Sequence, residues 1–503
     1  MSKLKKTAII ITLLSLVLKF SGFLRESVMA MQFGANHYTD GYLISFSFIT
    51  LVVAMISGGF NNVFLPMYVK NRKERPEETE KNAIGVMNQT VTWFFGLTLA
   101  LYFFVPYFLP LMFPEMNDVT EKTAVDVTQF FFLFLSAIAL NGILESYLQA
   151  RRIFVPAQIS RLLATLTGAI FALLFSEQMG INSLAYGFIT GTILGGLLQY
   201  FYLSKSGFPW QPTLQIEPEF RKTLLVLLLP SFLNTIVGQI NMFINKIFAS
   251  GTVEGAVTYL NNASLLVSIP NTIYATTIAT IIFTLLAEQV NDRKKFQNTV
   301  FMGLELSFIS LVPIAVGLYI VGMPALSFIY ERGEFNSQDT ANTYLALVNY
   351  LPLMVVQGLH YIVAKSMYAL EKTKVIMRIS ITTVLLNILL NSLLVDRLGY
   401  PGLAMTSSLV SFYFLFFSFM ALYKDFPKEE TRRVLLMCLK VIIPSAFMAV
   451  PLLLIQYTTD IESLYSLWQL LILVPLGILF YIIGSYLFNR EGFYRVIRIV
   501  KKK

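Results

Sequence analysis

The sequence predicts an all-α polytopic membrane protein with about 14 transmembrane helices. Hydrophobic residues make up 56% of the 503 residues and charged residues only 13%. A helix needs roughly 20 predominantly apolar residues to cross the hydrocarbon core of a bilayer, and fourteen stretches of the chain meet that need. In addition, 29 of the 38 Lys and Arg residues fall on the two terminal segments and on alternate connections between these stretches. Such an alternating bias is typical of multi-pass proteins.

The predicted spans follow one another along the chain with short polar connections between them. The longest connections, Lys70–Ala83 and Ser204–Lys222, leave no room for a soluble domain. The spans are expected near residues 7–24, 41–69, 86–113, 126–149, 155–176, 182–203, 222–248, 257–286, 299–323, 342–370, 375–395, 401–423, 434–456 and 465–488.

The positions of the basic residues predict the orientation of the chain. With the N-terminus inside, the outer connections hold only Arg25, Lys122, Arg332 and Arg397. Lys and Arg accumulate on the cytoplasmic side of membrane proteins. We therefore expect a multi-pass inner or plasma membrane protein with both termini in the cytoplasm, whose N-terminal apolar stretch is an uncleaved span.

Composition excludes several classes of function. The net charge of +9 resides in the cytoplasmic connections, where it favours an anionic leaflet and does not indicate nucleic-acid binding. Cys438 is the only cysteine, and His37 and His360 are the only histidines, so neither a disulfide nor a metal site is predicted. Because no Gly-rich phosphate loop is present, we predict a transporter, not an enzyme, with no cofactor. An ion gradient or the membrane potential is the expected energy source, together with consumption of the cargo downstream.

The two halves of the chain repeat each other. The segment Gly180-Ile-Asn-Ser-Leu-Ala185 corresponds to Gly399-Tyr-Pro-Gly-Leu-Ala404, an offset of 219 residues. Two further pairs of segments, beginning at Phe33 and Phe248 and at Tyr147 and Tyr368, have similar offsets in the same order. Repeats with an even number of spans have the same orientation, as in parallel-repeat transporters. The repeat predicts two six-helix lobes, 1–205 and 218–425, followed by two additional helices, 430–490, and a basic cytoplasmic tail, 491–503.

Ionisable residues inside the predicted spans are candidate binding residues. A charged side chain at the centre of a span costs roughly 2.5–3.5 kcal/mol, so it usually faces a cavity or a partner. Lys19 and Arg25 lie in or just after the first span, and Asp40 opens the second. Alternatively, Arg25 and Asp40 form a structural pair that pins two helix ends.

The seventh span carries a polar stripe. Asn234, Asn241 and Asn245 share one helical face and adjoin Lys246, and Asn261 and Asn262 continue the polar lining in the next span. Amides in such a stripe can simply bond neighbouring helices. The adjacent lysine favours a polar cavity instead.

The sign of the buried charge indicates the kind of cargo. Lys19, Arg25 and Lys246, with Arg161 as a further candidate, outnumber the acidic Asp40 and Glu305 in the predicted interior. Arg and Lys bind phosphate oxygens through charge-assisted hydrogen bonds. A cationic cavity therefore suits an anion such as a pyrophosphate, whereas an exporter of organic cations would carry the opposite balance.

Several short motifs, in order from about residue 10 to residue 425, resemble the MviN/MurJ family of lipid II flippases. They are Phe20-Ser-Gly-Phe-Leu-Arg-Glu26, Phe33-Gly-Ala35, Thr39-Asp40, Phe64-Leu-Pro66, Gln239-Ile-Asn, Ile247-Phe-Ala-Ser250, Glu254-Gly255, Pro270, Glu331-Arg-Gly-Glu-Phe335 and Gly399-Tyr-Pro-Gly-Leu-Ala404. The resemblance implies a multidrug/oligosaccharidyl-lipid/polysaccharide exporter fold with a central cationic cavity. It also implies that an undecaprenyl-pyrophosphate-linked glycan is moved to the outer leaflet, with Lys19, Arg25 and Asp40 at functional positions. Membrane lipids and cell-wall or polysaccharide synthases are the expected partners.

The chain departs from the family pattern at two cavity positions, where Val53 and Leu265 stand in place of arginines. Two alternatives therefore stand beside a lipid II flippase: a flippase for capsule or exopolysaccharide lipid-linked units, and a cation-coupled drug antiporter of the same superfamily. A membrane scaffold for a glycan synthase is a third alternative, which the polar cavity residues disfavour.

Overall fold

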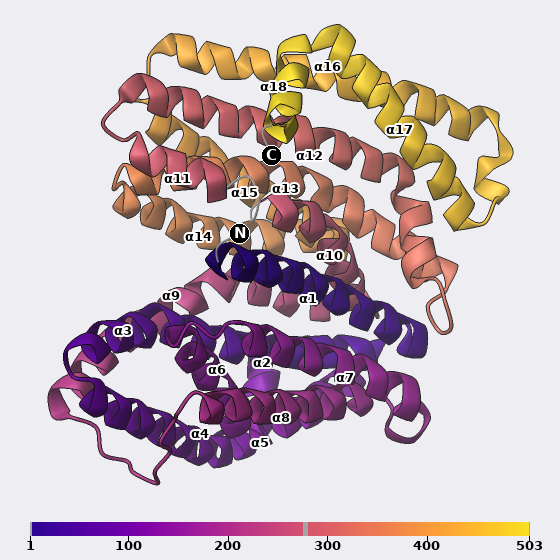
Figure 1. Cartoon of the computed structure of the whole chain (residues 1–503). Helices are drawn as coiled ribbons and strands as arrows, with labels where there is room; N and C mark the ends of the chain where they lie inside the picture. Colours follow the sequence, from indigo (N-terminus) through magenta and orange to yellow (C-terminus); the bar gives the residue numbers. More distant parts are fainter. Residues whose placement is uncertain (1–2, 275–279, 502–503) are drawn as a thin grey trace. The chain divides into compact units, whose positions relative to one another are not determined.

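The computed structural model describes residues 3–274 and 280–501, and all regular structure in these ranges is helical (Figure 1). This confirms the predicted all-α class. The helices of the first half are α1 (Lys3–Phe33), α2 (His37–Gly59), the π-helical turn η1 (Phe60–Phe64), α3 (Leu65–Glu74), α4 (Pro76–Met112), α5 (Asp118–Leu133), α6 (Leu135–Ala150), α7 (Val155–Met179), α8 (Asn182–Lys205) and α9 (Pro218–Ser250). Those of the second half are α10 (Ala256–Tyr274), α11 (Thr280–Glu288), α12 (Arg293–Tyr330), α13 (Ser337–Ala369), α14 (Thr373–Leu398), α15 (Tyr400–Tyr423), α16 (Lys428–Thr458), the 3-10 turn η3 (Asp460–Ser463), α17 (Ser466–Phe488) and α18 (Arg490–Lys501).

Among the described residues, ten helical runs are long and apolar enough to cross a membrane. An eleventh is the pair α5 and α6, which bends by 55°. Helices α1, α9 and the pair α10–α11 cover the three remaining predicted spans, so the structure is consistent with fourteen crossings. The predicted span 257–286 falls partly on residues 275–279, which lie outside the described part of the chain.

Asparagine caps define where three of the helices begin. Asn36 and Asn336 each form a capping box, in which the side chain accepts hydrogen bonds from the first turn of α2 or α13. Asn117 caps α5 in a simpler way, accepting a hydrogen bond from the N–H of Val119. Such caps satisfy N–H groups that a helix cannot bond internally.

The chain forms two compact units. The first comprises residues 1–258 and 332–335, and the second comprises residues 259–331 and 336–503. In the first unit, α7 and α8 run side by side, α1 packs along α7, and α2 packs on α5 and α9 (Figure 1). A Cβ added at Gly191 of α8 would lie 1.9 Å from Thr167 Oγ1 of α7, so only glycine permits this close approach.

The compact units and the repeat divide the chain by different criteria. The repeat starts a second lobe at residue 218, whereas compactness places α9 in the first unit, where it packs along α2. In the second unit, α16 and α17 pack on each other and on α12. The segment expected as a basic tail forms α18, whose Arg495 pairs with Glu305 of α12.

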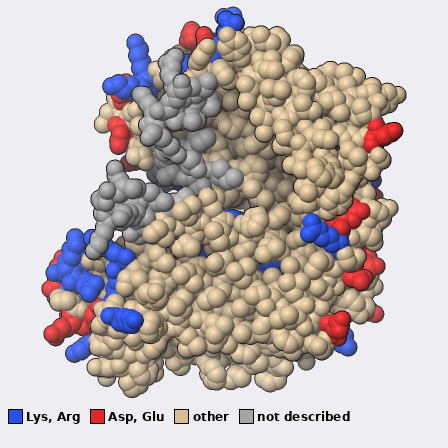
Figure 2. All heavy atoms as spheres, turned by 45° about the vertical axis from the view of Figure 1, so that its right-hand side comes forward, with Lys and Arg blue, Asp and Glu red and all other residues tan. Residues whose placement is uncertain are grey.

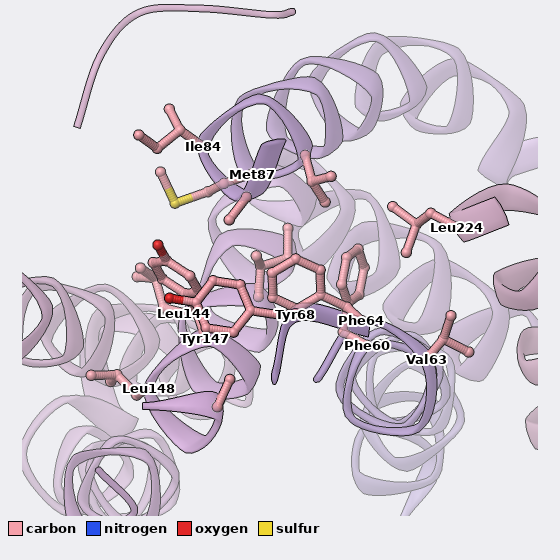
Figure 3. Close-up of a cluster of buried hydrophobic side chains, with 14 of the residues drawn as sticks. Phe60, Val63, Phe64, Tyr68, Ile84, Met87, Leu144, Tyr147, Leu148 and Leu224 are labelled. Carbon is pink, nitrogen blue, oxygen red and sulfur yellow. The ribbon is translucent and has the colours of Figure 1, made fainter. Parts of the chain in front are cut away.

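An aromatic core stabilises the first unit. Phe60, Phe64, Tyr68 and Tyr147 lie against one another near Met87 (Figure 3). On the face seen in Figure 2, charged side chains gather mainly toward the left, right and upper margins, a few basic ones show nearer the middle, and uncharged residues form most of the remaining described surface. An uncharged surface of this kind suits contact with lipid tails.

Candidate functional site

Arg25 is largely enclosed by the protein. Its side chain is 11% exposed and pairs with the carboxylate of Glu26, which is 2% exposed. The guanidinium carbon lies 4.1 Å from the centre of the Phe46 ring on α2, a cation–π contact. The Nε–H of Arg25 is buried and has no hydrogen-bond acceptor among the described residues. Arg25 therefore retains a donor that a ligand oxygen can satisfy.

Lys246 on α9 is held against α2 by neutral oxygens. Its Nζ donates to the backbone oxygen of Leu43 at 2.8 Å and to the hydroxyl of Ser47. The charges of Glu26, Asp40 and Arg25 all act on this lysine. The structure thus brings Arg25, Asp40 and Lys246, three of the predicted residues, into one electrostatic group.

Asp40 bonds to α10 and not to Arg25. Its Oδ1 accepts hydrogen bonds from the N–H of Thr258 at 2.9 Å and from the Thr258 hydroxyl at 2.7 Å. The alternative of an Arg25–Asp40 pair is wrong, because Glu26 takes the arginine and the first turn of α10 takes the aspartate. Asp40 acts as an N-cap supplied from another helix, an arrangement that a helix dipole favours.

The predicted amide residues lie on two helices in different surroundings. Asn241 of α9 has a buried Oδ1 without a hydrogen-bond partner among the described residues, and Asn245 is half-buried on the same helix. On α10, in the second unit, Asn261 is half-buried and Asn262 is fully buried. The amide oxygen and nitrogen of Asn262 are both without a partner among the described residues. The side chain of Asn234, another member of the predicted stripe, lies outside the described residues.

Lys19 is not brought into this group. It lies on an exposed part of α1, six residues before Arg25, and the described residues give it no ion pair. Val53 and Leu265, the positions without the family's arginines, are half-buried on α2 and α10 respectively.

Sequence reasoning missed Glu26, which offsets part of the predicted positive charge. An acidic residue directly after Arg25 in an apolar helix was the available signal, since a buried carboxylate usually has a cationic partner. Two other charges in the sign argument are also paired. Arg161 pairs with Glu145, with Nε 3.1 Å from Oε2, and Glu305 pairs with Arg495.

Two further contacts connect chain turns near Asp40. The backbone N–H of His37 donates to Glu254 at 3.3 Å, and the imidazole Nε2 lies 3.8 Å from the same carboxylate. The turn 332–335, between α12 and α13, belongs to the first compact unit. Its Glu334 N–H donates to the backbone oxygen of Met31, at the end of α1, at 3.0 Å. The ends of α1 and α2 are thus bonded to segments distant in the sequence.

Known proteins resemble the chain over most of its length. A family model described as lipid II flippase MurJ matches residues 29–475. A probable lipid II flippase MurJ of Rickettsia prowazekii (strain Madrid E) is 26% identical over 490 residues, which cover 94% of each chain. One of Buchnera aphidicola subsp. Acyrthosiphon pisum (strain APS) is 26% identical over 422 residues, covering 81% of each.

A solved structure supports the same relationship. Lipid II flippase MurJ in an inward closed conformation matches with a TM-score of 0.81 at 25% sequence identity, covering 96% of this chain and 99% of that one. The sequence match and the fold agree over nearly the whole chain. The chain therefore belongs to the MurJ family of lipid II flippases.

Proposed function

We propose that the chain moves lipid II, an undecaprenyl-pyrophosphate-linked glycan, from the inner to the outer leaflet of the bacterial cytoplasmic membrane. Membership of the MurJ family supports this cargo. The observation that carries the proposal is the group of Arg25 and Lys246, two partly buried cations that interact electrostatically. A pyrophosphate needs cationic donors when it leaves water.

The predicted binding residues contact different parts of the cargo. Arg25 and Lys246 neutralise the pyrophosphate, with the free Nε–H of Arg25 as a ready donor. Lys19, exposed on α1, meets the charged head group before it reaches Arg25. Asn241, Asn245, Asn261 and Asn262 bond sugar or peptide groups. The prenyl tail stays in the surrounding lipid.

Transport proceeds by alternating access, and Asp40 acts in the outer gate. The bonds from Thr258 to Asp40 support this role, because they join α2 to α10 and must break if these helices separate. The capping bonds of one side chain are worth roughly 0.5–2 kcal/mol, small enough to be broken in each transport cycle. The membrane potential or an ion gradient drives the cycle, and synthases that consume the glycan take the product.

A second candidate is a flippase for a different polyprenyl-linked glycan, such as a capsule or exopolysaccharide unit. The resemblance implies arginines where Val53 and Leu265 stand, and their absence motivates this candidate, whereas family membership favours lipid II. A cation-coupled drug antiporter is disfavoured, because such a protein needs an accessible acid and Glu26 is paired with Arg25.

Depletion of the protein from its own cell separates the two candidates. Extraction and mass spectrometry of lipid-linked precursors should show lipid II accumulating on the cytoplasmic side, where it stays protected from an external enzyme that cleaves its peptide. Accumulation of another polyprenyl-linked glycan, with lipid II unchanged, would refute the proposal in favour of the second candidate.

A further inference from the structure

A groove lies on the surface of the first unit, between α4 and the connection that joins α8 to α9. Its volume is about 600 Å³, within the range of small-ligand sites. The residues that line it are Gln89, Thr92, Trp93, Gly96, Leu97, Ala100, Leu214 and Arg221. None of them belongs to the group around Arg25.

Hydrogen bonds hold one wall of the groove in place. The Asn88 amide donates to the backbone oxygens of Gln211 at 2.8 Å and Thr213 at 2.9 Å, and the Gln89 amide donates to that of Leu214 at 2.6 Å. Gly85 lets the connection come close, because a Cβ there would lie 2.2 Å from the Gln215 oxygen. The connection is therefore fixed along α4, and the groove is a built feature of the fold.

The lining changes from polar to apolar along α4. Gln89 and Thr92 lie at the end where the connection is bonded to α4 through Leu214, and Trp93, Leu97 and Ala100 follow toward the middle of the span. The eleven helical steps from Gln89 to Ala100 cover about 16 Å at 1.5 Å per step. A Cβ added at Gly96 would meet no atom within 4 Å, so the apolar end is open. This gradient matches a molecule with a polar head and an apolar tail.

The surroundings of the groove indicate which amphiphile it holds. Only 17% of the apolar window of α4 is buried within the protein, so the helix faces lipid tails. Trp93 is 70% exposed, as is common for tryptophan near a membrane interface. Arg221 is exposed and has no ion pair among the described residues. A free guanidinium favours a phosphate whose charge is not cancelled by an ammonium.

We infer that this groove binds one anionic phospholipid of the cytoplasmic leaflet, with its phosphate on Arg221 and its chains along Trp93, Gly96 and Ala100. The leaflet follows from the orientation that the basic residues predict, which places the connection before α9 inside. A zwitterionic lipid fills the same apolar space without the charge attraction. The long prenyl chain of the cargo is the alternative occupant of the groove.

Tryptophan fluorescence provides the test, because the chain has only Trp93, Trp210 and Trp468. The full chain with Trp210→Phe and Trp468→Phe is placed in vesicles that contain brominated phosphatidylglycerol or brominated phosphatidylcholine. One basic residue near an anionic surface contributes an attraction equivalent to about a fivefold enrichment. We expect brominated phosphatidylglycerol to quench Trp93 to a given extent at about one fifth of the mole fraction that brominated phosphatidylcholine needs for the same extent.

Two adjacent basic residues supply a matched pair of variants. Arg221→Gln should abolish the preference for phosphatidylglycerol, whereas Lys222→Gln, which removes the same charge one residue away and outside the groove, should preserve it. Gly96→Leu, which fills the apolar end, should reduce quenching by both lipids. Equal quenching by the two lipids, or an equal loss in the two charge variants, would overturn the inference. Relief of quenching by unbrominated undecaprenyl pyrophosphate, but not by phosphatidylglycerol, would assign the groove to the cargo instead.

Discussion

At the scale of single residues, the charges within the predicted spans differ in how they are neutralised. Arg25 pairs with Glu26, and Arg161 with Glu145. Among the described residues, Lys246 has no such carboxylate, since its direct partners are a backbone oxygen and a hydroxyl. The cost of burying a cation is only partly offset by neutral acceptors. Lys246 therefore has the most to gain from an anionic ligand, and Arg25 the most to lose structurally when it is changed.

Arg25→Gln is expected to lower both stability and transport. Removing one partner of a buried ion pair leaves the other charge uncompensated, at a cost of about 3–5 kcal/mol. The double change Arg25→Gln with Glu26→Gln removes both charges and should recover most of the melting temperature in detergent. It should not recover lipid II transport if Arg25 contacts the pyrophosphate. Transport by the double variant would show that Arg25 only pins α1.

At Lys246, reversal of charge should weaken binding of a pyrophosphate lipid analogue more than neutralisation does. Opposite charges about 4 Å apart interact by about 4 kcal/mol at an effective dielectric constant near 20. Lys246→Glu turns this attraction into repulsion, whereas Lys246→Gln only removes it. Binding isotherms of the two purified variants provide the comparison. Equal affinities would place Lys246 outside the anion site.

At the scale of elements, the turn 332–335 packs closely against the end of α1. Gly333 has a φ of +58°, and a Cβ there would lie 2.1 Å from the Met31 backbone oxygen. Gly34 has a φ of +68°, and a Cβ added there would lie 2.8 Å from the Glu334 backbone oxygen. Two glycines thus allow one backbone to approach another where no side chain fits.

Gly333→Ala should destabilise the protein more than Gly207→Ala. Both positions have positive φ, which costs alanine about 1–2 kcal/mol, but Gly207 has nothing within 4 Å of an added Cβ. Only Gly333→Ala adds a collision with the backbone of Met31. Thermal unfolding of the two purified variants measures the difference. Matching melting temperatures would mean that the turn is not docked on α1.

The elements that the sequence predicts well are those set by apolar length. Each predicted span overlaps described helices, although residues 275–279 of the span 257–286 lie outside the described part of the chain. About 20 apolar residues have few other stable arrangements in lipid. Pairing of charges is predicted less well. The sequence singles out Arg25, whose side chain is 11% exposed, but it does not predict the pairing with Glu26, because pairing depends on the rotamers and packing of α1 against α2. The bonds of Asp40 to Thr258, 218 residues away, likewise require the tertiary fold.

At the scale of the whole molecule, the basic residues predict how the chain is inserted. Labelling can test this, because Cys438 is the only cysteine. In a Cys438→Ser background, an impermeant maleimide should label Ser463→Cys, between α16 and α17, in intact cells. It should label Tyr494→Cys on α18 only after permeabilisation, since Lys and Arg accumulate inside. The reverse labelling pattern would place every connection on the side of the membrane opposite to the predicted one.

The cargo of the whole chain can be tested by expressing it in a cell that lacks its only lipid II flippase. We expect the unmodified chain to restore growth, because Arg25 and Lys246 already supply cationic donors. Adding Val53→Arg and Leu265→Arg should then give no benefit. Each new arginine at a half-buried position of a span costs about 2.5–3.5 kcal/mol at the helix centre, so the amount of protein in the membrane should fall. Colony counts and immunoblots measure both effects. Failure of the unmodified chain at normal abundance, with growth restored by the two arginines, would show that lipid II requires the missing cations and that the natural cargo is another glycan.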